Sequence, residues 1–300
     1  MRIWRNATIA LGFMAVLGAC ASPQTATVTS QALVDPPRNE AHPAANRQLL
    51  IPSHSEEMNA VFFLAAGEGP KPTVLLMHGL PGNERNLDLA QAMRRAGWNV
   101  LTFTYRGAWG STGAFSIGNA VEDTRAALEY VRRPDVAALY GVDTSHIVLA
   151  GHSMGGFATA LTGADDPAIA GIILLDAWNV GASVAQIRPN GAQGRAAAIA
   201  SLDDLGRALN GATAETIIDE ALASTSAWDL TTHADALARH PVLLIYATDG
   251  IAEDNRALAA AIQAQPGART DIVAFDTDHA FADHRIALSV AVVDWLQRLE

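Results

Sequence analysis

The sequence has 300 residues, of which half are apolar and 17% are charged. This balance is typical of a globular domain with a sizeable core. The formal net charge at pH 7 is −11, and Lys71 is the only lysine. So large an excess of negative charge disfavours binding to phosphate backbones, and we predict no nucleic-acid partner.

The first 19 residues are predicted to be a signal peptide. Arg2 and Arg5 precede an apolar run over 7–19, which is shorter than the roughly 20 residues of a membrane-spanning helix. The letters LGAC, ending at Cys20, resemble a bacterial lipoprotein processing box, and Cys20 is the only cysteine. We therefore predict lipidation of Cys20; the alternative is an ordinary cleaved signal.

Residues 20–43 are rich in Ser, Thr, Pro, Gln and Ala, a composition that predicts a flexible tether. The resemblance to lipoproteins implies anchoring in the bacterial cell envelope. The Ala21-Ser22 pair, without Asp after the cysteine, favours the outer membrane.

In chain order, apolar runs alternate with segments of helical periodicity. This βαβα order predicts one α/β domain over 44–300, with a mostly parallel sheet covered by helices. The predicted strands are 60–65, 73–77, 99–105, 146–150, 171–176, 241–247 and 270–275, and the predicted helices are 84–96, 119–133, 154–163, 253–263 and 280–299.

One connection is too long for a single crossover helix. Residues 177–240 carry alanine and leucine at helical spacing. We predict a small helical cap at the carboxyl edge of the sheet, where open α/β folds bind ligands.

The letters GHSMGG at 151–156 lie between a predicted buried strand and a predicted helix. This is the context of a nucleophile elbow, in which Gly151 and Gly155 permit a sharp turn and Ser153 is lifted out of the sheet edge. Ser153 is the predicted nucleophile, and Met154 and Leu80 are the predicted backbone donors of an oxyanion hole. Leu80 belongs to the loop HGLPGN over 78–83, in which His78 is predicted to be structural.

A serine nucleophile needs a histidine base and a carboxylate that orients it. His279, between the last predicted strand and helix, is the predicted base, with His284 as the alternative. Asp249 follows a predicted strand directly and is the predicted acid. Asp176, which ends another strand, and Asp254 remain alternatives.

The glycine-rich stretch YRGAWGSTGAFS over 105–116 lacks the pattern of a phosphate-binding loop. Arg106 in it is predicted to be a structural hydrogen-bond donor. No His, Cys and carboxylate cluster has metal-ligand spacing, so we predict no metal.

HGLPGN, YRGAWGSTG, GHSMGG, Asp249 and DHAF occur in the order found in the α/β-hydrolase family, which the chain resembles over roughly 45–300. The resemblance implies an eight-stranded sheet, no cofactor and a serine hydrolase related to monoacylglycerol lipases and proline-type aminopeptidases. The sequence departs from the family pattern at two positions. Asp249, the predicted acid, lies one residue earlier than the spacing common in the family. Asp278 precedes His279, where many relatives have glycine.

The function predicted is hydrolysis of carboxylic esters, with thioesters or small amides as further substrates, through an acyl-enzyme on Ser153. The expected partner is a small acyl substrate. The alternatives are a serine aminopeptidase of the same fold and a lipid-anchored binding protein without catalysis.

Overall fold

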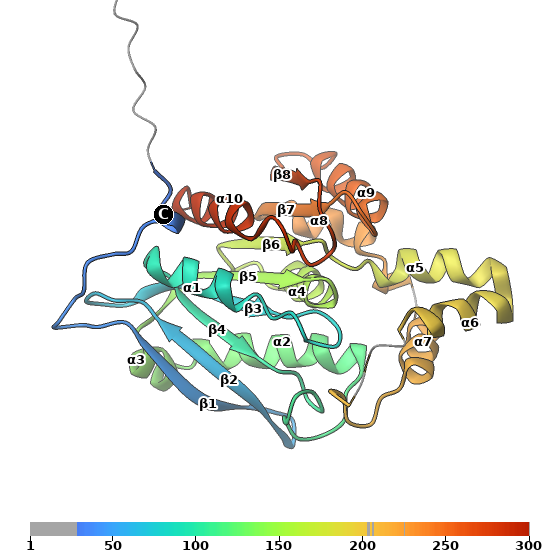
Figure 1. The fold of residues 1–300 in the computed structure, drawn as a ribbon, viewed down its shortest axis with the longest axis horizontal. Helices are drawn as coiled ribbons and strands as arrows, with labels where there is room; N and C mark the ends of the chain where they lie inside the picture. Colours follow the sequence, from blue (N-terminus) through green and yellow to red (C-terminus); the bar gives the residue numbers. More distant parts are fainter. Residues whose placement is uncertain (1–28, 203–204, 206, 225, 300) are drawn as a thin grey trace, which may run out of the picture.

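The computed structural model describes residues 29–202, 205, 207–224 and 226–299 (Figure 1). The predicted signal peptide and Cys20 lie outside these residues. No helix in the described ranges is both long and apolar enough to cross a membrane.

Eight strands form one sheet in the order β1-β2-β4-β3-β5-β6-β7-β8. β2 pairs antiparallel with β1 and β4, and all other pairs are parallel, which confirms the predicted mostly parallel sheet. The strands are β1 (Ala45–Ser53), β2 (Glu56–Leu64), β3 (Lys71–Met77), β4 (Asn99–Phe103), β5 (Val142–His152), β6 (Gly171–Leu175), β7 (Pro241–Ala247) and β8 (Arg269–Phe275).

Helices cover both faces of the sheet, as predicted. α2 (Ile117–Arg132), α4 (Met154–Asp165) and α9 (Ala252–Gln263) bury apolar side chains in one core, together with part of the cap. α1 (Leu87–Arg95) and α10 (Arg285–Gln297) bury theirs in a second core on the opposite face. β4 and β6 are buried along their whole length, as is typical of strands inside a mostly parallel sheet.

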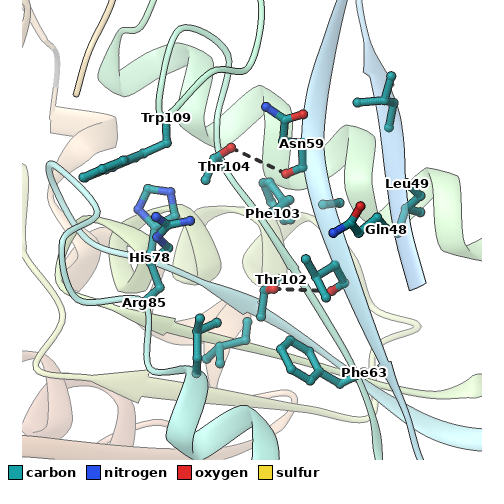
Figure 2. A pocket seen from close by; sticks show the side chains of 15 residues that line it. Gln48, Leu49, Asn59, Phe63, His78, Arg85, Thr102, Phe103, Thr104 and Trp109 are labelled. Carbon is teal, nitrogen blue, oxygen red and sulfur yellow. Dashed lines mark hydrogen bonds between the residues drawn. The ribbon is translucent and has the colours of Figure 1, made fainter. Parts of the chain in front are cut away.

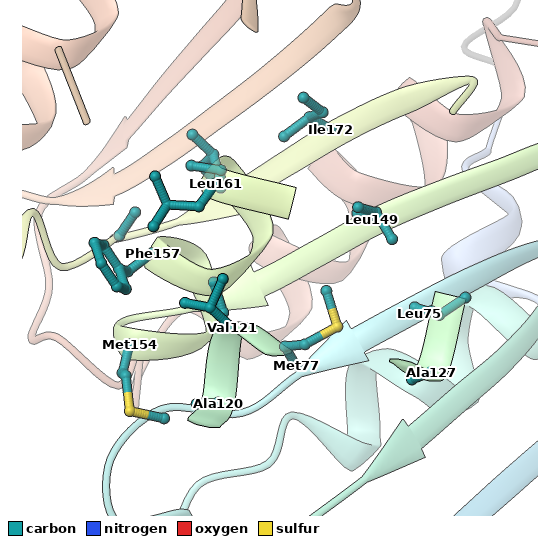
Figure 3. Close-up of a cluster of buried hydrophobic side chains, with 14 of the residues drawn as sticks. Leu75, Met77, Ala120, Val121, Ala127, Leu149, Met154, Phe157, Leu161 and Ile172 are labelled. Atoms are coloured by element: carbon teal, nitrogen blue, oxygen red, sulfur yellow. The ribbon is translucent and has the colours of Figure 1, made fainter. Parts of the chain in front are cut away.

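The first core lies directly beneath the elbow (Figure 3). The side chains of Met154 and Phe157, from the start of α4, are fully buried there with Met77 and Leu149. Burial of this kind stabilises each side chain by about 1.5–3 kcal/mol. The strand that leads into the serine and the helix that follows it are therefore held by the same core.

The described part of the segment between β6 and β7 is largely helical, over the range predicted to form a cap. It contains α5 (Val180–Ile187), α6 (Gly191–Ser201), α7 (Ala214–Ala223) and α8 (Ala234–Leu237), and α5 and α6 project beyond the sheet in Figure 1.

A carboxylate docks this segment on the helices that cover the sheet. Both oxygens of Glu220, on α7, accept hydrogen bonds from the backbone N–H groups of Ile117 and Gly118, at 2.8 and 2.9 Å. The first N–H groups of a helix have no partner within it and favour negative charge. The first turn of α2 is therefore the anchor for α7.

Three local features differ from the sequence-based prediction. β1 was missed because it is an edge strand with mostly exposed side chains, and α3 (Pro134–Tyr140) was missed because it is short. In the predicted tether, a 3-10 turn over Gln31–Leu33 packs against α10. There Ala32 is buried, and Ser30 Oγ donates to Asp294 at 2.6 Å.

Candidate active site

Ser153 occupies the turn between β5 and α4, with φ 56° and ψ −120°. A non-glycine residue at positive φ costs of order 1–3 kcal/mol, so the surrounding structure must enforce this conformation. A Cβ on Gly151 would lie 2.1 Å from the carbonyl oxygen of Gly155, and a Cβ on Gly155 would lie 2.5 Å from that of Met77. No larger residue fits at either glycine, which is the close packing that a nucleophile elbow requires.

His279 contacts a carboxylate from the neighbouring strand end. Its Nδ1 lies 2.5 Å from Oδ2 of Asp176, the residue that directly follows β6. Asp176 is fully buried and has φ 41°. Because Nδ1 is engaged by the carboxylate, Nε2 is the ring nitrogen of His279 left for a proton from another group.

The structure does not bring Asp249 to His279, contrary to the sequence-based assignment. The Asp249 side chain is exposed, and its Oδ1 accepts a hydrogen bond from the N–H of Gly250 at 2.9 Å. Asp254 instead accepts from Gln186 Nε2 at 3.3 Å. The carboxylate beside His279 is thus Asp176, which the sequence left as an alternative.

The alternative base, His284, lies elsewhere. Its Nδ1 is 2.9 Å from Asp283 Oδ1, and its ring packs on Phe275 with centroids 5.4 Å apart. His284 is the residue before α10 and does not reach Asp176 in the described structure.

Asn255, on α9, orients the buried carboxylate and was not identified from the sequence. Its Nδ2 donates to Asp176 Oδ1 at 3.2 Å, and its Oδ1 accepts from the N–H of Ala177 at 3.0 Å. The side chain is 1% exposed. An asparagine one turn into a helix has no motif around it, so only the packing of α9 on β7 and β8, which brings Asn255 to Asp176, reveals its role.

His152, the variable position before the serine, holds the loop that carries His279. Its Nε2 donates to the carbonyl oxygen of His279 at 2.8 Å, and the two rings have centroids 4.7 Å apart. Burial lowers the pKa of His152 to about 3, so the ring is neutral at pH 7. The contact positions His279 through its backbone.

Asp278, the residue before His279, closes the same turn. Its Oδ1 accepts a hydrogen bond from the N–H of Ala282 at 2.8 Å, and its carbonyl accepts from Phe281. The carboxylate therefore supplies a side-chain turn contact of the kind that Asp commonly makes with backbone two to four residues on.

The loop after β3 lies against the serine. A Cβ on Gly79 would be 2.9 Å from Ser153 Cβ, so only glycine permits this approach. Tyr105 Oη donates to the carbonyl oxygen of His78 at 3.0 Å, and Trp109 Nε1 donates to that of Pro81 at 2.7 Å. These contacts fix the backbone on both sides of Leu80.

Met154, the other predicted donor, is the first residue of α4. A backbone N–H at this position has no partner within the helix and points out of its N-terminus. Met154 directly follows Ser153 in the sequence, and the loop that contains Leu80 packs against Ser153.

His78 and Arg106 both have structural contacts. His78 is 2% exposed, its Nδ1 lies 2.7 Å from the carbonyl oxygen of Gly79, and burial lowers its pKa to about 4. Arg106 binds the buried carboxylate of Asp123 through its backbone N–H at 2.7 Å and its Nε at 2.5 Å. The latter pair ties the YRG loop to α2.

Across the described ranges, no group of three or more His, Cys, Asp and Glu residues is arranged to hold a metal ion.

Comparison with known proteins identifies the family. Residues 74–291 match the family described as the Alpha/beta hydrolase family. The curated quorum-quenching protein AidA of Acinetobacter baumannii (strain MDR-ZJ06) is 29% identical over 137 residues, which cover 44% of this chain and 43% of AidA. The chain thus matches less than half the length of that relative.

Solved esterases share the fold. Est1E from Butyrivibrio proteoclasticus superposes with a TM-score of 0.63 at 17% identity, covering 84% of this chain and 98% of Est1E. The carboxylesterase EstE1, from a metagenomic library, gives 0.61 at 23% identity, covering 86% and 91%. Because the family match spans most of the sheet and both sides of the elbow, the chain belongs to the alpha/beta hydrolase family.

Proposed function

We propose that this protein is a serine hydrolase that cleaves carboxylic esters, with Ser153 as nucleophile, His279 as base and Asp176 as acid. The observation that carries the proposal is the 2.5 Å contact between His279 and the buried Asp176, at the sheet edge where the elbow presents Ser153. The strained φ of Ser153 and the pairing of His279 with Asp176 are both expected of a nucleophile with its base and acid.

In the proposed reaction, His279 Nε2 takes the Ser153 proton as Oγ attacks the acyl carbon. Asp176 accepts the Nδ1 hydrogen bond, fixes the tautomer and stabilises the imidazolium. Return of the proton from Nε2 to the leaving oxygen releases the alcohol and leaves an acyl-enzyme. Water, activated by the same nitrogen, then releases the acid.

Negative charge develops on the carbonyl oxygen in both steps. The backbone N–H groups of Leu80 and Met154 are the proposed donors to it. Support comes from the loop of Leu80, which is held by Tyr105 and Trp109, and from the buried Met154 side chain, which fixes the start of α4. Donors held in place before the reaction stabilise the oxyanion without reorganisation.

The cap offers a place for the acyl or alcohol group. A cavity of about 410 Å³ lies among α5, α6 and α7, within the usual range for small-molecule sites. Trp178 lines this cavity, and its backbone N–H donates to the carbonyl oxygen of Ser153 at 2.9 Å. The apolar part of the lining, Trp178, Ile187, Ala197, Ala198, Leu202 and Ile218, favours an aliphatic or aromatic group.

The test is a panel of p-nitrophenyl esters, thioesters and aminoacyl anilides, assayed with the wild-type protein and Ser153→Ala. Similarity to a protein named for quorum quenching adds small signal molecules to the panel. Ester turnover lost in Ser153→Ala, with fluorophosphonate labelling of Ser153, supports the proposal. Turnover of anilides alone indicates an aminopeptidase, and neither turnover nor labelling indicates a protein without catalysis.

We also propose that the mature protein is anchored to the bacterial envelope by lipid on Cys20, because the LGAC box ends at the sequence's only cysteine. One acyl chain binds a membrane only weakly, so the anchor would carry more than one. Metabolic labelling with an alkyne fatty acid should mark the wild-type protein and not Cys20→Ala. Equal labelling of both would contradict the anchor and leave the hydrolase proposal intact.

A further inference from the structure

A groove of about 570 Å³ lies on the outer half of the sheet, over β1, β2 and β4 (Figure 2). Neither Ser153 nor His279 lines it. Alternate side chains of a strand share a face, and Asn59, Val61 and Phe63 of β2 line the groove together with Thr102 of β4. α1 packs on β4 and β2, and its first residue, Leu87, lines the groove. The groove is open at Asn59, which is exposed.

The apolar part of the groove is partly exposed. Phe63 and Leu76 form its buried floor, whereas Leu50 and Leu87 at its rim are 49% and 43% exposed. Exposed apolar side chains around a concave surface are typical of a ligand site. An apolar ligand group of moderate size would bury these exposed side chains.

The charge of the groove is opposite to that of the protein. No acidic residue is among the described residues that line it, although the chain carries a net charge of −11. Arg85 lies at one end, with its guanidinium 4.9 Å from the ring centre of Trp109. It forms no ion pair with any carboxylate of the described ranges, so its charge is available to an anion.

A buried hydrogen-bond acceptor lies at the same end. His78 is neutral at pH 7 and its Nδ1 lies 2.7 Å from the carbonyl oxygen of Gly79, which requires the proton to be on Nδ1. Nε2 is then an acceptor, and it is buried with no partner among the described residues. An unsatisfied buried polar atom costs about 1–3 kcal/mol, which a donor from a ligand would recover.

Arg85 and His78 converge on one residue of the loop. Arg85 Nε donates to the carbonyl oxygen of Gly82 at 3.2 Å, and a Cβ on Gly82 would lie 2.6 Å from His78 Cε1. Figure 2 shows the two side chains next to each other beneath Trp109. Because backbone contacts already hold both side chains in place, little side-chain conformational entropy would be lost when a ligand binds.

We propose that this groove is a second binding site, for an aliphatic hydroxycarboxylic acid. The carboxylate pairs with Arg85, a hydroxyl close to it donates to His78 Nε2, and the alkyl chain lies over Val61, Phe63 and Leu76. The proposal does not depend on hydrolysis at Ser153, because none of its groups acts on the serine or on His279.

The experiment is calorimetric titration of Ser153→Ala with 3-hydroxydecanoate and with decanoate, below their micelle concentrations. We expect one site, with the hydroxy acid binding at least fivefold more tightly. Arg85→Gln should weaken binding about tenfold, as expected for loss of a charge-assisted hydrogen bond. Asn59→Trp, a substitution at an exposed position of β2 that lines the groove, should abolish binding.

Arg133→Gln is the matched control, because Arg133 lies in a different, charged surface hollow on α2. It should bind like the parent protein. Binding unchanged by both groove substitutions would overturn the site, and equal affinity for the two acids would overturn the role of His78. Loss of binding when Ser153 of the wild-type protein carries a phosphonate would place the ligand at the catalytic serine instead, which also contradicts the proposal.

Discussion

Asp176 and Asp249 follow adjacent parallel strands, β6 and β7, at the same edge of the sheet, yet their surroundings differ completely. Asp176 is fully buried between His279 and Asn255. Asp249 is exposed and accepts only a hydrogen bond from the next residue. A carboxylate at a strand end can therefore belong to the site or to an ordinary surface turn, and burial with an orienting partner distinguishes the two.

The β6 and β7 strand ends also differ in their contribution to the contacts that hold His279. Its ring is fixed by Asp176, and its backbone by the neutral His152. Both contacts come from the β5–β6 side of the sheet, next to Ser153. The β7 turn that carries Asp249 contributes neither, so this proposed triad is assembled from two neighbouring strand ends and one loop.

The largest effect is expected on removal of the base. His279→Gln should lower kcat by about 10⁴-fold or more, because loss of a base acting with the nucleophile removes most of the catalysis. His284→Gln is the control and should stay within about threefold of wild type. Ester hydrolysis under steady-state conditions measures both; a larger loss in the control would transfer the role to His284.

A smaller effect is expected at the residue that orients the acid. Asn255→Ala should lower kcat about 10- to 100-fold with little change in KM, because the Asp176 carboxylate loses a hydrogen bond without any substrate contact being removed. Thr248→Val, in the neighbouring β7 turn, should leave kcat unchanged. Equal kcat values for Asn255→Ala and wild type, with both folded, would show that Asn255 has no positioning role.

The buried neutral histidines predict acid sensitivity of the fold. Burial lowers the pKa values of His152 and His78 to about 3 and about 4, against 6.5 in the unfolded chain. The unfolded state therefore binds more protons below pH 6.5, and stability falls as the pH is lowered. Each histidine should account for a loss of about 2 kcal/mol between pH 7 and pH 5.

Urea unfolding at the two pH values measures this loss. His152→Gln should reduce it by about half of the histidine contribution, whereas His146→Gln, at an exposed position, should not change it. A loss in His152→Gln as large as in wild type would contradict the neutral state of the buried ring.

The smallest effect concerns the cap. Ala198→Trp fills the cavity among α5, α6 and α7 and should shift the preferred p-nitrophenyl ester towards shorter chains, with a several-fold change in kcat/KM. Ala196→Trp lies on the same helix at an exposed position outside the cavity lining. An identical chain-length profile for Ala198→Trp and the control would remove the cavity from substrate binding.

The parts of the site with local sequence signals were predictable. The elbow and the loop of His78 and Leu80 depend on glycines at fixed spacing, and His279 lies between a strand and a helix that the apolar pattern indicates. The predicted sheet was correct for the same reason, except that the exposed edge strand β1 has no such pattern.

The acid was not predictable in the same way, because its partner is 103 residues away in sequence. Asp176 and Asp249 both follow apolar strands, and no local pattern separates them. Their difference arises from tertiary packing: α9 brings Asn255 to β6, and the last loop folds His279 over it. Asn255 and His152 were not identified because no local sequence pattern indicates a residue whose role is to orient another side chain.

The most direct test compares Asp176→Asn with Asp249→Asn in one ester assay, with thermal unfolding to confirm that both variants fold. The account predicts a loss of about 10⁴-fold in kcat for Asp176→Asn, since the asparagine would favour the wrong histidine tautomer. Asp249→Asn should keep near-full activity. The reverse result, or equal activity in the two variants, would contradict the assignment of Asp176 as the acid.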